Sequence, residues 1–263
     1  MWKYYDSPLF DEQIYNRKKQ RLIDLGRKIS DLTLKGLFWG KNGANALEKE
    51  RIKFSKNNAS HWLNYPEFLS AGSSTYYAAS GNAGSRAKVS NLFFKPFWYW
   101  RGWRCLRTAE KLSDKFAKLM PSEDMSLGEL DIRACILNKA GRRSESLTIL
   151  SHGIMKILTG QIGTKHDLCL FLIHEAEVIT GMKTYDKENR AEKNYQQAMK
   201  LSEDETVPAL TKVRVMKSYG KFLVDAKRIF EAKHLLNEAY WLAEANSLND
   251  QVVKIKSLLA GIR

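Results

Sequence analysis

The densest group of potential metal ligands in the sequence lies in one short segment of the second half. Its members are His166, Asp167, Cys169, His174 and Glu175. On a helix, His166 and His174 would lie eight residues and more than two turns apart, too far to share one ion. The segment also lacks the His-Glu-x-x-His spacing that places two histidines around zinc on one helix face. We therefore predict two ordinary helical histidines and no metal site.

Catalytic motifs of other kinds fail on their spacing. Residues 81–88 read Gly-Asn-Ala-Gly-Ser-Arg-Ala-Lys, but a phosphate-binding loop needs four residues between its glycines and Lys-Ser or Lys-Thr directly after the second. The chain has no Gly-x-Ser-x-Gly elbow and no cysteine with a convincing histidine partner. Its acidic pairs fall on the wet faces of expected helices, where nothing apolar would tune an acid or a base. We predict no catalytic residues and no cofactor, although an enzyme whose site is assembled only by folding stays open as a third class of function.

A third segment combines aromatic rings with positive charge. Seven of the eleven residues from Phe93 to Trp103 are aromatic, and basic residues continue to Lys118. A helix cannot turn so many rings to one side, so either the segment packs in a core between the two halves, which we favour, or some rings serve a partner. The partner would be an anionic membrane interface, where Trp and Phe commonly lie beside Lys and Arg, or single-stranded nucleic acid, on which rings stack. Either docking mode would use Trp98, Tyr99, Arg101, Arg104 and Arg107.

The charge of the chain agrees with an anionic partner. The net charge is +14, and residues 1–125 carry most of it, with 22 Lys and Arg against 12 Asp and Glu. Such an excess attracts nucleic acid, anionic membranes or acidic proteins, or simply keeps the protein soluble. The three cysteines are far apart and predict neither a disulfide framework nor a zinc ribbon. Because we find no signal peptide and no apolar run of about 20 residues, we expect a cytoplasmic protein without a transmembrane segment.

Helices must position these residues, because proline is scarce while Ala, Leu, Lys and Glu are abundant. Residues 1–120 are expected to form a basic, aromatic-rich helical region. Apolar residues recur at helical spacing and predict helices from Ser7 to about Lys35, over 44–56, and from Pro96 to Leu119. Residues 70–92 are small, polar and rich in glycine, which predicts a long loop. The best domain boundary is at residues 121–124.

In the second half, small and large residues recur at fixed offsets. The first set comprises Ala134, Leu137, Gly141, Ser146, Leu150 and Gly153; the last comprises Gly220, Leu223, Ala232, Leu236 and Ala239; a degenerate copy between them comprises Ala191, Tyr195 and Ala198. Small residues at such positions let two antiparallel helices approach closely, and large ones fill the space beside them. Ser126 with Glu129 predicts a capping box at the first helix, and Thr164 with Asp167 caps a later one. A final apolar pattern from Val252 to Ile262 predicts a helix that covers the end of the stack.

These offsets resemble the tetratricopeptide repeat over residues 126–263. The resemblance implies an all-α fold, in which a helical N-terminal region precedes a short α-solenoid of about three antiparallel helix hairpins and a C-terminal capping helix. It also implies a scaffold or adaptor whose concave face, built from the first helix of each pair, binds a protein or peptide. Positions on that face include Asp131, Cys135, Asn138, Lys139, Arg214, Lys217 and Lys221.

The cations at these positions suit an acidic peptide, and the alternative is a solvated helix face. Cys135 stands where the family's carboxylate-clamp subclass has asparagine, so that function is not implied. The predicted partner-binding residues are Asn138, Lys139, Arg214, Lys217 and Lys221. The sequence thus predicts a non-enzymatic protein-binding module, and the alternative is a basic protein that docks on an anionic membrane or nucleic acid through residues 93–118.

Overall fold

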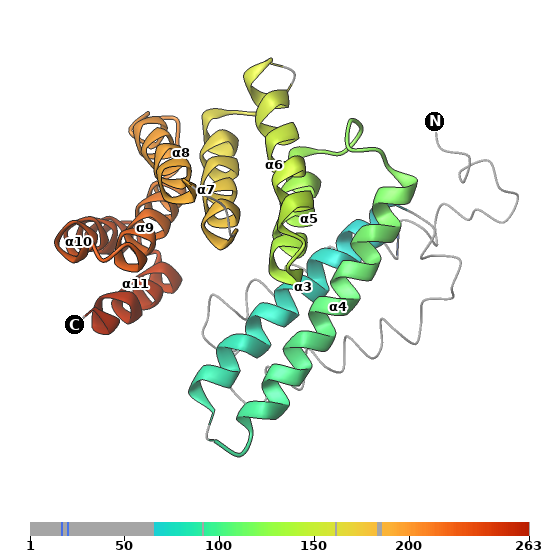
Figure 1. Cartoon of the computed structure of the whole chain (residues 1–263), viewed down its shortest axis with the longest axis horizontal. Helices are drawn as coiled ribbons and strands as arrows, with labels where there is room; N and C mark the ends of the chain where they lie inside the picture. Colours follow the sequence, from blue (N-terminus) through green and yellow to red (C-terminus); the bar gives the residue numbers. More distant parts are fainter. Residues whose placement is uncertain are drawn as a thin grey trace, which may run out of the picture. The chain divides into compact units, whose positions relative to one another are not determined.

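A computed structural model describes residues 66–262, except 91, 161 and 183–185, together with Arg17 and Gln20 (Figure 1). Apart from these two residues, the helices expected before residue 57 lie outside the described part. The chain divides into two compact units, Met1–Asp124 and Met125–Arg263. Every regular element of the described residues is an α-helix, which confirms the predicted all-α fold.

The described part of the first unit is a hairpin of two long helices, α3 (Pro66–Val89) and α4 (Lys95–Leu119), which pack side by side (Figure 1). Helix α4 agrees with the prediction, and Pro96 lies in its first turn, where the missing N–H costs nothing. Ala109 and Phe116 are among the buried residues of α4. Among the described residues, no helix is long and apolar enough to cross a bilayer.

The prediction of a glycine- and serine-rich loop over residues 70–92 is wrong, because most of this segment forms α3. Its small residues allow close packing: a Cβ at Gly102 of α4 would lie 3.3 Å from both the Cβ of Ala83 and the carbonyl oxygen of Ser80. The hydroxyl of Ser80 donates to the carbonyl of Tyr77 at 2.8 Å, so a buried polar side chain is satisfied within its own helix. Close contact along the hairpin thus outweighs the poor helix propensity of the segment.

The second unit is a stack of three helix hairpins followed by a single helix. The helices are α5 (Leu127–Ala140), α6 (Arg143–Leu158), α7 (Lys165–Gly181), α8 (Lys187–Ser202), α9 (Ala209–Asp225), α10 (Ile229–Ala245) and α11 (Asn249–Gly261). Partners within each hairpin pack together, α7 contacts both α5 and α9, and α11 packs against α10 and α9. This arrangement confirms the predicted short solenoid of about three hairpins with a C-terminal capping helix.

Local signals define the ends of several of these helices. Ser126 and Glu129 form the predicted capping box, in which the backbone N–H of Ser126 donates to the Glu129 carboxylate at 2.9 Å. Thr164 and Asp167 form a second box at the start of α7. Gly141 ends α5 in the left-handed conformation, with φ of 90°, which glycine adopts without a Cβ penalty.

The small residues of the predicted repeat lie where helices touch. A Cβ at Gly220 of α9 would lie 2.7 Å from Cγ of Leu236 on α10, and Ala232 of α10 is fully buried. The hydroxyl of Ser146 on α6 donates to the carbonyl of Ala134 on α5 at 2.8 Å. These positions therefore allow the close approach of paired helices that the offsets predict.

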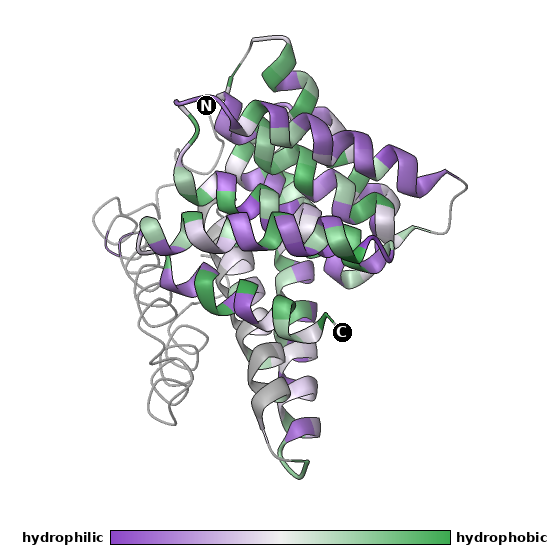
Figure 2. Cartoon of the chain, turned by 90° about the vertical axis from the view of Figure 1, so that its left-hand side faces the viewer, coloured by the Kyte–Doolittle hydropathy of each residue, from purple (hydrophilic) through white to green (hydrophobic). Residues whose placement is uncertain are grey.

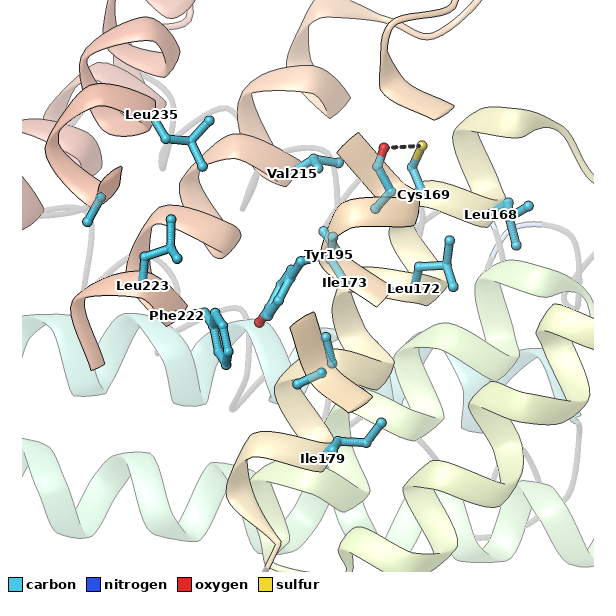
Figure 3. Close-up of a cluster of buried hydrophobic side chains, with 14 residues drawn as sticks. Leu168, Cys169, Leu172, Ile173, Ile179, Tyr195, Val215, Phe222, Leu223 and Leu235 are labelled. Atoms are coloured by element: carbon cyan, nitrogen blue, oxygen red, sulfur yellow. Dashed lines mark hydrogen bonds between the residues drawn. The ribbon is translucent and has the colours of Figure 1, made fainter. Parts of the chain in front are cut away.

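A core cluster of this unit surrounds Tyr195 (Figure 3). The Tyr195 ring lies 5.3 Å from that of Phe222 and stacks on Tyr219 at 5.4 Å between centroids. Cys169 is buried in the same cluster and donates to the carbonyl of Ala198. Burial raises the pKa of its thiol to about 11, so Cys169 is a neutral packing residue.

Candidate functional sites

Residues of α5 to α9 line a polar cleft of about 270 Å³. Its charged lining residues are Glu177 of α7, Lys221 and Asp225 of α9, and Arg143 at the start of α6. The remaining lining residues are Asn138, Thr180, Gly181, Tyr195, Ser218 and Phe222. Helices α5, α7 and α9 all contribute, so the cleft follows the stacking of one hairpin on the next.

Contacts between helices fix two of the charged groups in the cleft. The hydroxyl of Ser218 donates to Oε1 of Glu177 at 3.0 Å, which ties α9 to α7. A Cβ at Gly181 would lie 2.5 Å from Nε of Arg143, so the missing side chain makes room for this guanidinium. Because Gly181 is the last residue of α7, Arg143 also lies at the negative end of that helix dipole.

The structure brings two of the five predicted partner-binding residues into the cleft, Asn138 and Lys221. Lys217 is instead engaged with α11, where its Nζ donates to Oε1 of Gln251 at 2.7 Å. Burial, together with the charges of Lys254 and Arg214, lowers the pKa of Lys217 to about 8. Arg214 therefore belongs to this second basic group.

Lys139, the fifth predicted residue, lies on α5 one residue beyond Asn138 but is not part of the cleft lining. Burial lowers its pKa, and the charge of Cys135 opposes that shift. Lys139 thus lies near Cys135 and outside the lining of the cleft to which Lys221 belongs. The predicted cation cluster is divided among three places on the unit.

Sequence reasoning missed the acidic residues of the cleft, Glu177 and Asp225. One signal could have found the first of them: Glu177 and Lys221 each lie thirteen residues after the N-caps of their helices, Thr164 and Pro208. Counting from the N-cap aligns the first helices even where the loops between them differ in length. Arg143 could not be found in this way, because it belongs to a second helix.

A second group of polar side chains joins α5 to α7. Nδ1 of His174 lies 2.5 Å from Oδ1 of Asp131 and 3.8 Å from Sγ of Cys135. The burial of His174 disfavours its charged form, but Cys135 and Asp131 outweigh burial and hold its pKa well above the usual value. The expectation that no cysteine has a histidine partner is therefore wrong, since α5 and α7 bring together residues far apart in sequence. His166 is separate, with Nδ1 2.6 Å from the Thr211 hydroxyl.

The first unit carries an exposed apolar surface at the turn between α3 and α4. Leu92 and Phe93 expose 87% and 88% of their surface, and Phe94 exposes 56%. We call these three residues the hairpin tip, which Figure 2 shows as a hydrophobic connection between the two helices. A contiguous exposed apolar patch of this kind is uncommon unless it contacts another surface.

The rings of α4 continue this surface. Phe97, Tyr99, Trp100 and Trp103 each expose about half of their area. Each of three arginines lies over a ring: Arg101 over Trp98 at 5.3 Å, Arg104 over Trp100 at 4.9 Å, and Arg107 over Trp103 at 5.7 Å.

Among the predicted docking residues, Tyr99, Arg104 and Arg107 are exposed, whereas Trp98 and Arg101 are partly buried. Arg107 also pairs with Glu110 at 2.8 Å. The exposed part of the segment therefore combines apolar rings with guanidinium groups held against them.

The cleft carries polar groups and charges of both signs, and it has room for only a few side chains of a bound molecule. The hairpin of the first unit exposes apolar and cationic groups that could contact a larger surface. Neither arrangement by itself specifies a reaction. No protein-family model matches the sequence, and no curated protein matches it significantly.

Proposed function

We propose that residues 125–263 form a tetratricopeptide-like binding module that holds a peptide segment of a protein partner in the cleft between α5, α7 and α9. The observation that carries this proposal is the cleft itself, which is lined by all three first helices. At about 270 Å³ it lies below the usual range of small-molecule pockets, roughly 300–1,000 Å³. It therefore suits one or two side chains of an extended peptide better than a cofactor.

The cleft offers a carboxylate on the partner two cations to pair with. Its lining carries Arg143 and Lys221 beside Glu177 and Asp225, and neither cation forms an ion pair within the described residues. A carboxylate that enters the cleft would bind these cations through charge-assisted hydrogen bonds. The partner segment is thus expected to carry Asp or Glu at the position that enters the cleft.

Selection from a displayed peptide library on the full-length chain tests this proposal. We expect the selected peptides to be enriched in Asp or Glu, and their affinity to fall about tenfold or more in Lys221→Glu and Arg143→Glu, because each change replaces an attraction with a repulsion. Lys233→Glu, an equal charge change at an exposed position of α10, is the matched control. Peptides that bind Lys221→Glu and Arg143→Glu as tightly as Lys233→Glu would contradict the proposal.

We propose as a second function that the hairpin of the first unit docks on an anionic membrane surface. The hairpin tip favours a membrane over nucleic acid, because Leu92 cannot stack on a base, whereas Leu and Phe enter the acyl boundary readily. Helix α4 contributes seven Lys and Arg against two Asp and Glu, which suits anionic headgroups. The tip would enter the interface while Arg104 and Arg107 remain at headgroup level.

Co-sedimentation with phosphatidylserine-containing vesicles tests the docking function. We expect binding that weakens with salt and falls at least about tenfold in Leu92→Ser/Phe93→Ser, since each buried apolar side chain contributes about 1.5–3 kcal/mol. Phe230→Ser is the matched control, because Phe230 of α10 is equally exposed, at 85%. Binding to single-stranded DNA without binding to vesicles would replace the membrane proposal with a nucleic-acid one.

A further inference from the structure

Three side chains of the second unit are arranged as a set of metal ligands. Asp131 and Cys135 lie one turn apart on α5, so they point the same way, and His174 of α7 faces them. One potential ligand atom from each residue lies within 4.8 Å of the other two. The set joins the first hairpin to the second, and none of the three residues lines the cleft.

A hydrogen bond accounts for only part of this geometry. The Oδ1 of Asp131 and the Sγ of Cys135 both approach Nδ1 of His174, at 2.5 Å and 3.8 Å. A ring nitrogen carries at most one proton, and the nearer Asp131 carboxylate is the partner that accepts it, while the Cys135 thiol, a weak donor and acceptor, lies beside the same nitrogen. The hydrogen bond to Asp131 therefore does not explain why Cys135 lies there too.

The same geometry argues against a catalytic Cys-His-Asp triad. In a triad, the carboxylate orients the imidazole through one ring nitrogen while the other nitrogen accepts the proton of the nucleophile. Here the thiol and the carboxylate share Nδ1. Convergence of three donor atoms of different kinds on one point is instead what a metal ion requires.

We propose that Asp131, Cys135 and His174 bind a Zn²⁺ ion between α5 and α7. Thiolate, imidazole and carboxylate are the three usual zinc ligands, with bonds of about 2.3, 2.0 and 2.0–2.2 Å. Tetrahedral bonds of these lengths separate the ligand atoms by roughly 3.3–3.6 Å. The distance of 3.8 Å between Sγ and Nδ1 is close to that value, and a rotation of Asp131 widens the shorter one.

The chemistry of the ligands selects the ion. The thiolate excludes Mg²⁺ and Ca²⁺, which take oxygen ligands, and the two negative ligands balance the charge of Zn²⁺. Three protein ligands leave a fourth position for water or for a side chain of a partner. This site does not depend on peptide binding in the cleft, so it stands or falls separately.

Titration of the reduced full-length chain with Co²⁺, a spectroscopic substitute for Zn²⁺, tests the proposal. We expect one ion per chain, a thiolate-to-cobalt charge-transfer band with visible d–d bands typical of tetrahedral coordination, and displacement of both by Zn²⁺. Cys135→Ser should abolish the charge-transfer band, whereas Cys105→Ser, in the other unit, should retain it. Asp131→Asn and His174→Gln should each weaken binding at least about tenfold.

A second measurement separates metal binding from an effect on folding. Zn²⁺ should raise the Tm of the wild-type chain and of Cys105→Ser, but not that of Cys135→Ser, because an ion that binds only the folded state stabilises it. Circular dichroism of each variant without metal checks that the helices are intact. The proposal is overturned if the wild-type chain shows no charge-transfer band, or if Cys135→Ser shows the same band.

Discussion

A methyl group added at Gly153 would lie 2.0 Å from Cε1 of Phe171, a residue that is almost fully buried. That contact joins α6 to α7 of the next hairpin, whereas the close contact of Gly220 with Leu236 joins the two helices of the last hairpin. Neither glycine has a positive φ, so both are required for close helix packing and not for an unusual backbone conformation. A buried aromatic ring cannot move away without disturbing its neighbours, which makes Gly153 the more sensitive of the two.

Gly153→Ala should therefore destabilise the protein by about 2 kcal/mol or more, because overpacking forces side chains and backbone to shift. Gly128→Ala is the control: Gly128 is an exposed residue of α5, and a Cβ there meets nothing within 4 Å. This second change should raise stability by about 0.4–1 kcal/mol through the lower entropy of the unfolded chain. Urea unfolding measures both, and equal effects at the two glycines would contradict the packing argument.

Lys217 should make stability depend on pH, since burial lowers its pKa from 10.5 to about 8 in the folded state. Below pH 8 Lys217 is charged in both the folded and the unfolded state, and the folded state is destabilised by the full free energy of burying that charge. Between pH 8 and 10.5 the unfolded state binds more protons, so stability rises with pH by about 1–2 kcal/mol in total.

Thermal unfolding of a Lys217→Met variant checks this sign. The variant lacks the titrating group, so the stability of the wild-type chain should improve relative to the variant as the pH rises from 8 to 10. The loss of the hydrogen bond to Gln251 shifts the variant equally at all pH values and leaves the slope unaffected. The same comparison with Lys233→Met, at an exposed position, should show no such trend.

Among the helices, α3 shows most clearly how packing overrides local preference. Its sequence is rich in glycine and serine, which are poor helix formers. It nevertheless forms a helix, because small residues such as Ala83 and Ala87 are buried along its length and Gly102 of α4 lies against Ala83 and Ser80. The stability of each helix in the hairpin should thus depend on the other.

Gly102→Leu should disrupt this hairpin, because even the Cβ would lie 3.3 Å from the backbone of α3. We expect faster amide hydrogen exchange in both α3 and α4, since neither helix keeps its partner. Gly84→Leu is the matched substitution, at a position where a Cβ meets no atom within 4 Å. Exchange that rises only in α4, or rises equally in the two variants, would show that α3 is stable without close contact.

At the level of the complete chain, the division between residues 124 and 125 separates the unit that carries the exposed aromatic and basic hairpin from the unit that carries the cleft. Two clusters of buried residues in the described part of the second unit are formed by its own helices. The capping box at Ser126 starts its first helix, and α11 covers the last hairpin. A solenoid with such ends has the contacts it needs to fold as a unit.

Residues 125–263 expressed alone should therefore be helical and unfold cooperatively. Far-ultraviolet circular dichroism and a urea titration measure this, and one sharp transition is the expected result. A full-length sample serves as the reference for the helix content of the fragment. A fragment with helical signal but a broad, non-cooperative transition would mean that the second unit needs the first for its core.

The features of this protein that its sequence determined alone are those with local causes. The capping box of Ser126 and Glu129 needs only two residues between its members, and the start of α4 needs only a proline in the first turn. The offsets around Gly220 and Ala232 also depend on helix geometry within one hairpin. The all-α class and the hairpins of the second unit could be predicted for this reason, whereas membership of the tetratricopeptide family stays a prediction.

The tertiary structure alone decided the features that depend on which helices lie side by side. Asp131 and His174 are 43 residues apart, and no spacing rule connects them until α5 packs on α7. The exposure of Trp103 and the helical state of α3 likewise depend on the partner that each surface finds. Contacts between distant segments are chosen by the packing of the whole unit, because the free energy of burial depends on neighbours that the local sequence does not specify.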